Sequence, residues 1–169
     1  MAIYEKDFSA VSLGNTMQDI GIPNRFLIVG AVLSGVTAFI HVACIYFGAP
    51  WYRLLGAGEQ MARMAEAGSW IPGIITAGIA VVLGIWALYA LSGAGVIRRL
   101  PFLRIGLCII TGIYLLRGVA ALPVALLQPK ETTAFLLWSS AICFGFGVTH
   151  LVGLRQRWHA MSVAVTVSL

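Results

Sequence analysis

The residues of this chain that are best suited to chemistry lie inside long apolar stretches. They are His41, Tyr114, Arg117 and His150. An arginine keeps its proton in a protein, and placing its charge at the centre of a membrane helix costs at least about 2.5–3.5 kcal/mol. An ionisable residue in such a place is therefore a functional hypothesis by default.

His41, Tyr114 and Arg117 are predicted to form one polar cluster in the outer half of a membrane domain. Tyr114 precedes Arg117 by three residues, so both lie on one helix face. Glu59 and Glu66 lie in the connection after the first predicted span, on the same side of the membrane as this cluster. These side chains would suit an anion, a carboxylate ligand or a quinone headgroup. Three alternatives stay open: Arg117 extends to the interface, pairs with a loop carboxylate such as Glu59, or contacts another subunit.

The two histidines raise the question of a haem or a metal ion. With a rise of about 1.5 Å per residue, His41 lies roughly 20 Å from the positively charged end of its predicted helix, and His150 only about 6 Å. Side chains at such different depths cannot ligate one ion. No metal site is therefore predicted, haem is disfavoured, and the cofactor is left unknown. His150 is interpreted as a boundary histidine that bonds a backbone carbonyl or a headgroup.

Other catalytic patterns do not occur. The sequence has no nucleophile elbow, P-loop or H-E-x-x-H motif. None of its six acidic residues lies in an apolar stretch, which disfavours a proton-coupled pump. The three cysteines stand alone, without a C-x-x-C pair, and are interpreted as small buried hydrophobes: Cys44, Cys108 and Cys143.

The composition indicates that lipid is the solvent of this chain. Of its 169 residues, 60% are hydrophobic and 10% are charged, whereas soluble domains carry about 25% charged residues. A bilayer core of about 30 Å needs about 20 apolar residues of helix. Four stretches are long enough: 26–47, 71–91, 101–126 and 133–154. The predicted fold is an all-α integral membrane protein, a four-transmembrane-helix antiparallel bundle spanning 26–154.

The distribution of positive charge predicts the orientation. One side of the predicted bundle carries seven basic residues: Lys6, Arg25, Arg98, Arg99, Arg104, Arg155 and Arg157. The other side carries Arg53, Arg63 and Lys130. We therefore expect both termini in the cytoplasm, and the bacterial inner (plasma) membrane as the location. Arg98, Arg99, Arg104, Arg155 and Arg157 are predicted to contact anionic headgroups. The +5 charge needs no nucleic-acid partner, because this rule accounts for it.

Three of the segments outside the predicted spans have a predicted structure of their own. Residues 1–25 read as a cytoplasmic amphipathic segment, and residues 155–169 as a cytoplasmic tail. Residues 48–70 are predicted to hold a short helix at the membrane surface, in which Glu59 pairs with Arg63 and Arg63 with Glu66. The alternative for this segment is a lid over an outward-facing pocket.

Three functional hypotheses follow. Small residues recur at three- and four-residue spacing in the predicted spans, and close packing of small residues is what associates helices in lipid. The first hypothesis is therefore a non-catalytic subunit or interaction protein of a larger membrane assembly, whose partners are other membrane subunits or a second copy. The second is a small transporter or ligand-binding protein that uses His41 and Arg117. The third is an electron-transfer protein that carries a cofactor.

Overall fold

The computed structural model describes residues 22–128 and 133–163, and these contain helices and no strands. Most of the predicted amphipathic segment 1–25 and the last residues of the tail lie outside the described residues. Four helical segments are long and apolar enough to cross a membrane: α2 (Arg25–Phe47), α5 (Ile71–Ala94), α6 (Leu103–Val119) continued by α7 (Ala121–Leu127), and α8 (Ala134–Arg157). The prediction of an all-helical chain with four such segments is confirmed.

Local signals explain where the long helices begin and end. The side chain of Asn24 accepts a hydrogen bond of 2.9 Å from the backbone of Leu27 and so caps α2. α5 ends at Gly95, which adopts a left-handed conformation with φ of 83°, as glycine does most readily. α8 begins after Thr133, whose hydroxyl accepts from the backbone of Leu136. The segment between α2 and α5 holds two short helices, α3 (Ala49–Leu54) and α4 (Glu59–Glu66).

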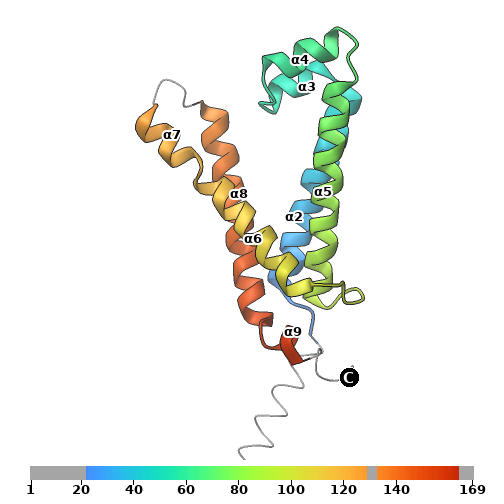
Figure 1. Cartoon of the computed structure of the whole chain (residues 1–169), viewed down its shortest axis with the longest axis vertical. Coiled ribbons are helices and arrows are strands. Elements are labelled where there is room, and N and C mark those ends of the chain that lie inside the picture. The colour runs from blue at the N-terminus through green and yellow to red at the C-terminus, as the bar shows by residue number, and fades with distance from the viewer. Residues whose placement is uncertain (1–21, 129–132, 164–169) are drawn as a thin grey trace, which may run out of the picture.

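The four long segments are arranged as two pairs. α2 lies along α5, and α6 lies along α8 (Figure 1). The pairs meet at the end that carries the short helix α9 (Ala160–Val163) and diverge toward the end that carries α3, α4 and α7. The long helices are thus paired two by two, and the two pairs are joined over only part of their length.

Hydrogen bonds join three helix termini at the end where the pairs meet. The backbone N–H of Asn24, before α2, donates to the carbonyl of Ala94 at the end of α5, at 3.0 Å. The Asn24 amide donates to the Gln156 side chain on α8 at 2.8 Å. The Arg157 guanidinium donates to the carbonyls of Ala94, at 3.0 Å, and Ile22, at 2.8 Å. We call this region the tied end. Its apolar core consists of Leu27, Ala94, Leu103, Leu107, Leu154 and Met161.

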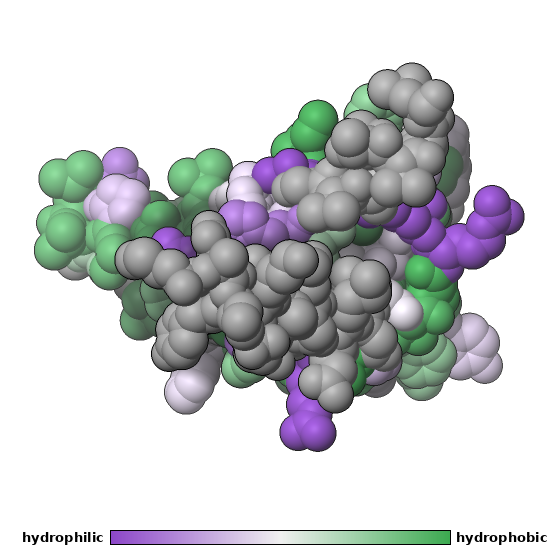
Figure 2. All heavy atoms as spheres, turned by 90° about the horizontal axis from the view of Figure 1, so that it is seen from below, coloured by the Kyte–Doolittle hydropathy of each residue, from purple (hydrophilic) through white to green (hydrophobic). Residues whose placement is uncertain are grey.

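The two ends of the molecule differ in charge. The charged residues described at the tied end are all arginines: Arg25, Arg98, Arg99, Arg104, Arg155 and Arg157. The α3–α4 end has two arginines and two glutamates, Arg53, Arg63, Glu59 and Glu66. Seen from the tied end, hydrophilic side chains project around the rim and apolar side chains cover the flanks (Figure 2). Positive charge therefore gathers at one end of the apolar helices.

Glycines set the closest contacts between helices. A Cβ on Gly30 of α2 would lie 2.7 Å from the His150 ring of α8, and one on Gly118 of α6 would lie 2.6 Å from the Phe144 backbone of α8. Helices that pack in lipid need small residues at such crossings, because no hydrophobic effect drives them together. These contacts hold α8 against both α2 and α6.

Two alanine substitutions on α2 test this packing. Gly30→Ala should destabilise the protein by about 1–3 kcal/mol, because the new methyl group must displace the His150 ring. The matched control is Gly35→Ala, where a Cβ would meet nothing within 4 Å. That change should stabilise the helix by about 0.5–1 kcal/mol. Thermal unfolding in detergent, followed by circular dichroism, measures both. Equal effects of the two substitutions would contradict the close contact at Gly30.

Candidate functional site

Tyr114 lies where all four long helices meet. Its side chain is buried, and its hydroxyl shares a 2.9 Å hydrogen bond with the hydroxyl of Ser34 on α2. Its ring packs edge-on against Trp86 of α5, at 4.9 Å between centroids, and against Phe146 of α8, at 5.5 Å. The His150 ring of α8 lies 5.3 Å away. We call Ser34, Trp86, Tyr114, Phe146 and His150 the central junction.

His150 occupies the interior of this junction and, as one of its predicted alternatives has it, bonds a backbone carbonyl rather than another side chain. Its side chain is 0% exposed. The Nδ1–H donates to the carbonyl of Phe146 at 2.9 Å, while the Nε2 atom has no hydrogen-bond partner among the described residues. A free imidazole nitrogen has the chemistry of a haem ligand. Haem fits poorly here, however, because Gly30 of α2 and the Tyr114 ring already enclose the imidazole.

Arg117 is bonded to α8. Its guanidinium donates from Nη1 to the Ser140 hydroxyl at 2.8 Å and from Nη2 to the Ser139 hydroxyl at 3.0 Å. Ser140 is buried and Arg117 is half-buried. Glu59 and Glu66, the acidic residues that the structure describes, do not bond Arg117. The guanidinium thus has polar partners but no counterion within the described part of the chain.

His41 lies on α2, where its Nδ1–H donates to the carbonyl of Thr37, one turn earlier, at 2.7 Å. Its side chain is half-buried. No hydrogen bond or ring contact of the described residues joins His41 to Tyr114 or Arg117. The structure therefore places the three predicted cluster residues in three separate sets of contacts, one with Thr37, one in the central junction and one with Ser139 and Ser140.

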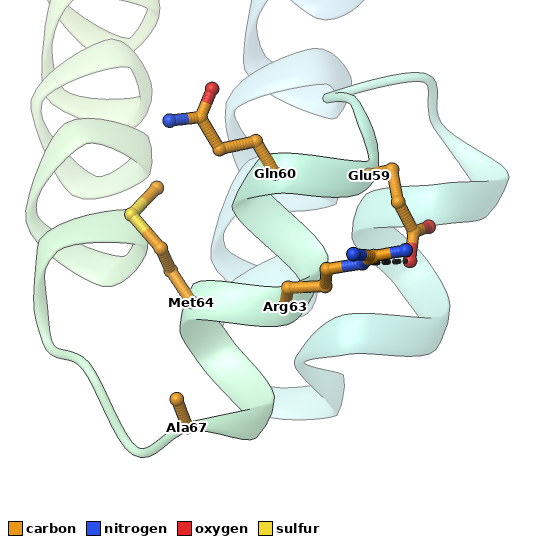
Figure 3. A pocket seen from close by; sticks show the side chains of 5 residues that line it. All are labelled: Glu59, Gln60, Arg63, Met64 and Ala67. Carbon is orange, nitrogen blue, oxygen red and sulfur yellow. Dashed lines mark hydrogen bonds and ion pairs between the residues drawn. The ribbon is translucent and has the colours of Figure 1, made fainter.

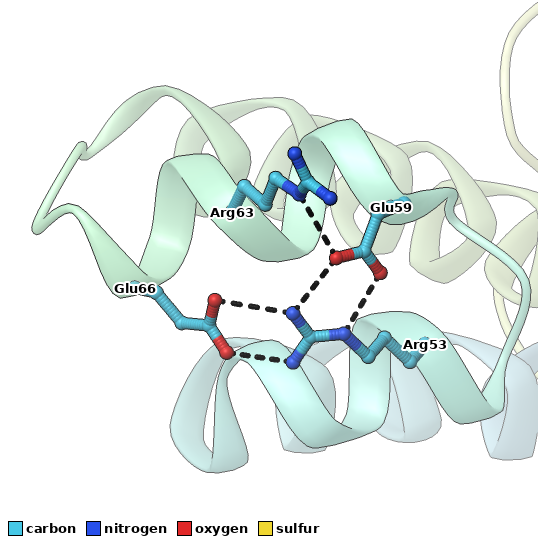
Figure 4. A network of polar contacts seen from close by, with 4 residues as sticks. All are labelled: Arg53, Glu59, Arg63 and Glu66. Carbon is cyan, nitrogen blue, oxygen red and sulfur yellow. Dashed lines mark hydrogen bonds and ion pairs between the residues drawn. The ribbon is translucent and has the colours of Figure 1, made fainter.

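The two loop carboxylates bind Arg53, a residue that the sequence did not single out. Arg53 of α3 donates to Glu59 at 2.9 and 3.0 Å and to Glu66 at 2.6 and 3.1 Å, both on α4 (Figure 4). Arg63 donates to Glu59 at 3.1 Å, so the predicted pairing of these two residues is present. Arg63 does not bond Glu66. Arg53 therefore clamps α3 to α4 by forked bonds, the strongest geometry for this ion pair.

These ion pairs change the acidity of the carboxyl groups. The hydrogen bonds from Arg53 and Arg63 lower the pKa of Glu59 from 4.5 to about 2. The hydrogen bond from Arg53 also lowers the pKa of Glu66. Both side chains are exposed to solvent. The carboxylates thus remain charged over the whole physiological range and hold the two short helices together.

The α3–α4 hairpin is also anchored to the long helices. Tyr52 of α3 is 2% exposed, and its hydroxyl accepts a hydrogen bond of 3.4 Å from Thr76 on α5. An apolar cluster lies beneath the hairpin, formed by Cys44, Ala49, Tyr52 and Ala62. The hairpin is therefore packed on the ends of α2 and α5, as a cap fixed by buried contacts.

A shallow hollow lies on the surface of this cap (Figure 3). It is lined by Glu59, Gln60, Arg63, Met64 and Ala67. Its two charged side chains, Glu59 and Arg63, bond each other. Because neither His41 nor Arg117 lines it, this hollow is not the predicted outer-half pocket.

The arginines of the tied end differ in what their side chains contact. Arg157 is 9% exposed and bonds the backbone carbonyls of Ile22 and Ala94, so little of its side chain faces solvent. Arg99 donates to the carbonyl of Met161. The Arg104 guanidinium lies 4.0 Å above the Trp158 ring, a cation–π contact. Arg98 and Arg155 are exposed. Headgroup contact thus stays a prediction for the exposed arginines.

No protein-family model, curated protein or solved structure matches this chain. Within the described residues, no group of three or more His, Cys, Asp or Glu side chains could hold a metal ion. The candidate site among the described residues thus consists of the central junction and of the hydrogen bonds from Arg117 to Ser139 and Ser140.

Sequence reasoning identified Tyr114 and Arg117 but missed their serine partners, since serine is common in membrane helices and carries no signal of its own.

The cap should respond to acid in a defined range. Glu59 has a lowered pKa in the folded protein, so its contribution to the hairpin is complete above pH 4.5 and is lost as the pH falls toward about 2. Arg53→Gln should raise the pKa of Glu59 and Glu66 toward 4.5, because their main hydrogen-bond donor is removed. Carboxyl-carbon NMR in detergent measures both titrations. A wild-type Glu59 that titrates near 4.5 would contradict the clamp.

Proposed function

We propose that this chain is a non-catalytic subunit, or interaction protein, of a larger membrane assembly. Its four long helices cross the bilayer, with the tied end and both termini on the cytoplasmic side. The six arginines at that end, against the balanced charges of the cap, support this orientation, since basic residues concentrate on the cytoplasmic face. The exposed arginines there contact anionic headgroups. The bacterial inner membrane is the location that we favour.

The observation that carries this proposal is a contrast between two sets of glycines. One set is used inside the chain, where a Cβ would lie within 3 Å of a neighbouring helix: Gly30, Gly93, Gly106, Gly118, Gly147 and Gly153. A second set lies on the long helices, where a Cβ would meet nothing within 4 Å: Gly35, Gly78, Gly84, Gly112 and Gly145. Glycine inside a helix costs about 0.5–1 kcal/mol relative to alanine, so the open set needs another use.

Close approach by a further membrane helix is such a use. Small residues at an interface let two backbones come together in lipid. The open glycines lie on α2, α5, α6 and α8, so both helix pairs offer places for contact. The divergence of the two pairs leaves additional helix surface that the other described helices do not cover (Figure 1).

Two substitutions on α6 separate assembly from folding. Gly112→Leu should release the chain from its complex and leave its own thermal stability within about 1 kcal/mol, because its side chain enters space outside the monomer. Gly118→Leu should instead destabilise the monomer, since its side chain meets the backbone of α8. Native mass spectrometry of the full chain, extracted in mild detergent, measures the complex, and thermal unfolding measures stability.

The proposal fails if the wild-type chain is a lone monomer under these conditions. It also fails if Gly112→Leu, together with the equivalent changes at Gly78 and Gly145, leaves the mass of the complex unchanged.

A further inference from the structure

A polar stripe on α2 continues beyond the central junction. Gly30, Ser34, Thr37 and His41 follow one another at three- and four-residue spacing, so they lie on one helix face. Gly30 meets His150 of α8, and Ser34 bonds Tyr114 of α6. This face is thus the one that α2 turns toward the other helix pair. Thr37 and His41 lie on it one and two turns nearer the cap, where the pairs diverge (Figure 1).

The other helix pair carries its own polar groups at the same end. Arg117 comes one turn after Tyr114 on α6, and it bonds Ser139 and Ser140 of α8. Ser139 lies five residues after the start of α8, which is about 8 Å along the helix. The guanidinium is therefore inside the apolar length of the helices but near the level of lipid headgroups on the cap side.

Within the described residues, no carboxylate bonds Arg117. Arg117 uses two N–H groups for the serines, and three of its five donors remain. Glu59 and Glu66 are engaged by Arg53. The two acidic residues that the structure describes lie on α4, outside the long helices. The remaining donors of Arg117 therefore have no acidic partner among the described residues.

The cap contacts α8 one turn before Ser139, which bonds Arg117. Gly56, between α3 and α4, is so close to Phe135 of α8 that a Cβ would lie 2.3 Å from the ring. The cap thus contacts the first turn of α8. Apolar side chains near Arg117 are strongly exposed, with Leu116 at 70% and Trp138 at 72%. An anion that carries apolar chains fits this setting better than a free ion.

We propose that Arg117, Ser139 and Ser140 bind the phosphate of an anionic membrane phospholipid from the leaflet on the cap side. The lipid headgroup reaches Arg117 from the membrane side, past the exposed apolar side chains of Leu116 and Trp138. Arginine pairs with phosphate through two parallel hydrogen bonds, and its three free donors are enough for this. The inference is independent of the proposed assembly role, because the lipid can bind whether or not a partner chain is present.

Native mass spectrometry of the full chain tests the site, with phosphatidylglycerol and phosphatidylcholine of identical acyl chains as probes. We expect the first phosphatidylglycerol to bind at least about tenfold more tightly than phosphatidylcholine, as a charge-assisted contact predicts. Addition of inorganic phosphate at 100-fold excess, an order-of-magnitude choice, should not displace it, because the site selects the phosphate of a lipid.

Matched variants locate the binding. Arg117→Gln should reduce the preference for phosphatidylglycerol to less than about twofold, whereas Arg117→Lys, which keeps the charge, should retain part of it. Arg155→Gln removes an exposed arginine at the tied end and should leave the tightest lipid in place. Circular dichroism of each variant verifies the fold, and Arg117→Lys serves if Arg117→Gln does not fold.

Four results would overturn the proposal. The first is a wild type without preference for phosphatidylglycerol, as expected if a carboxylate of a partner chain is the true counterion. The second is a folded Arg117→Gln that keeps the full preference or, if only the lysine variant folds, an Arg117→Lys that loses all of it. The third is loss of the tight lipid in Arg155→Gln, which would place it at the tied end. Displacement by inorganic phosphate would show that the site takes a free ion.

Discussion

The close contact of α2 with α6 and α8 around Tyr114 is the constraint on which the rest of the structure depends. Gly30 admits the His150 ring, and the hydroxyls of Ser34 and Tyr114 share a buried hydrogen bond. A hydrogen bond contributes only about 0.5–1.5 kcal/mol net. Much of the stabilisation of this contact therefore comes from packing of the rings, which the absence of a Cβ at Gly30 permits. Because this contact around Tyr114 joins the two helix pairs, the pairs separate only on the cap side of it.

Different interactions stabilise the two ends of the molecule. The tied end uses backbone carbonyls and one buried arginine, Arg157, to join α2, α5 and α8. The cap uses an exposed ion-pair network around Arg53, reinforced by the buried Tyr52. Exposed ion pairs contribute little on their own, so the cap depends on its apolar contacts for docking and on Arg53 for its internal geometry. Arg117 lies between these ends, and its partners among the described residues are the hydroxyls of Ser139 and Ser140.

The sequence predicted the helices better than their arrangement. Apolar length is a local property, so α2, α5 and α8 were located to within a few residues. Contacts between helices depend on which faces meet, and four apolar helices give little sign of this. The burial of His150 among the helices was therefore not predicted, and Arg53 was missed because a loop arginine has no distinguishing pattern. The Glu59–Arg63 pair could be predicted because spacing within one helix fixes it.

Distances between spin labels in lipid nanodiscs test the divergence of the two helix pairs most directly. One pair of labels belongs at Phe26 and Arg155 near the tied end, and another at Tyr46 and Trp138 nearer the cap, all on exposed positions. The structure predicts a longer distance for the second pair, by on the order of one helix diameter, about 10 Å. Equal distances for both pairs would indicate a bundle closed along its whole length and would contradict the account.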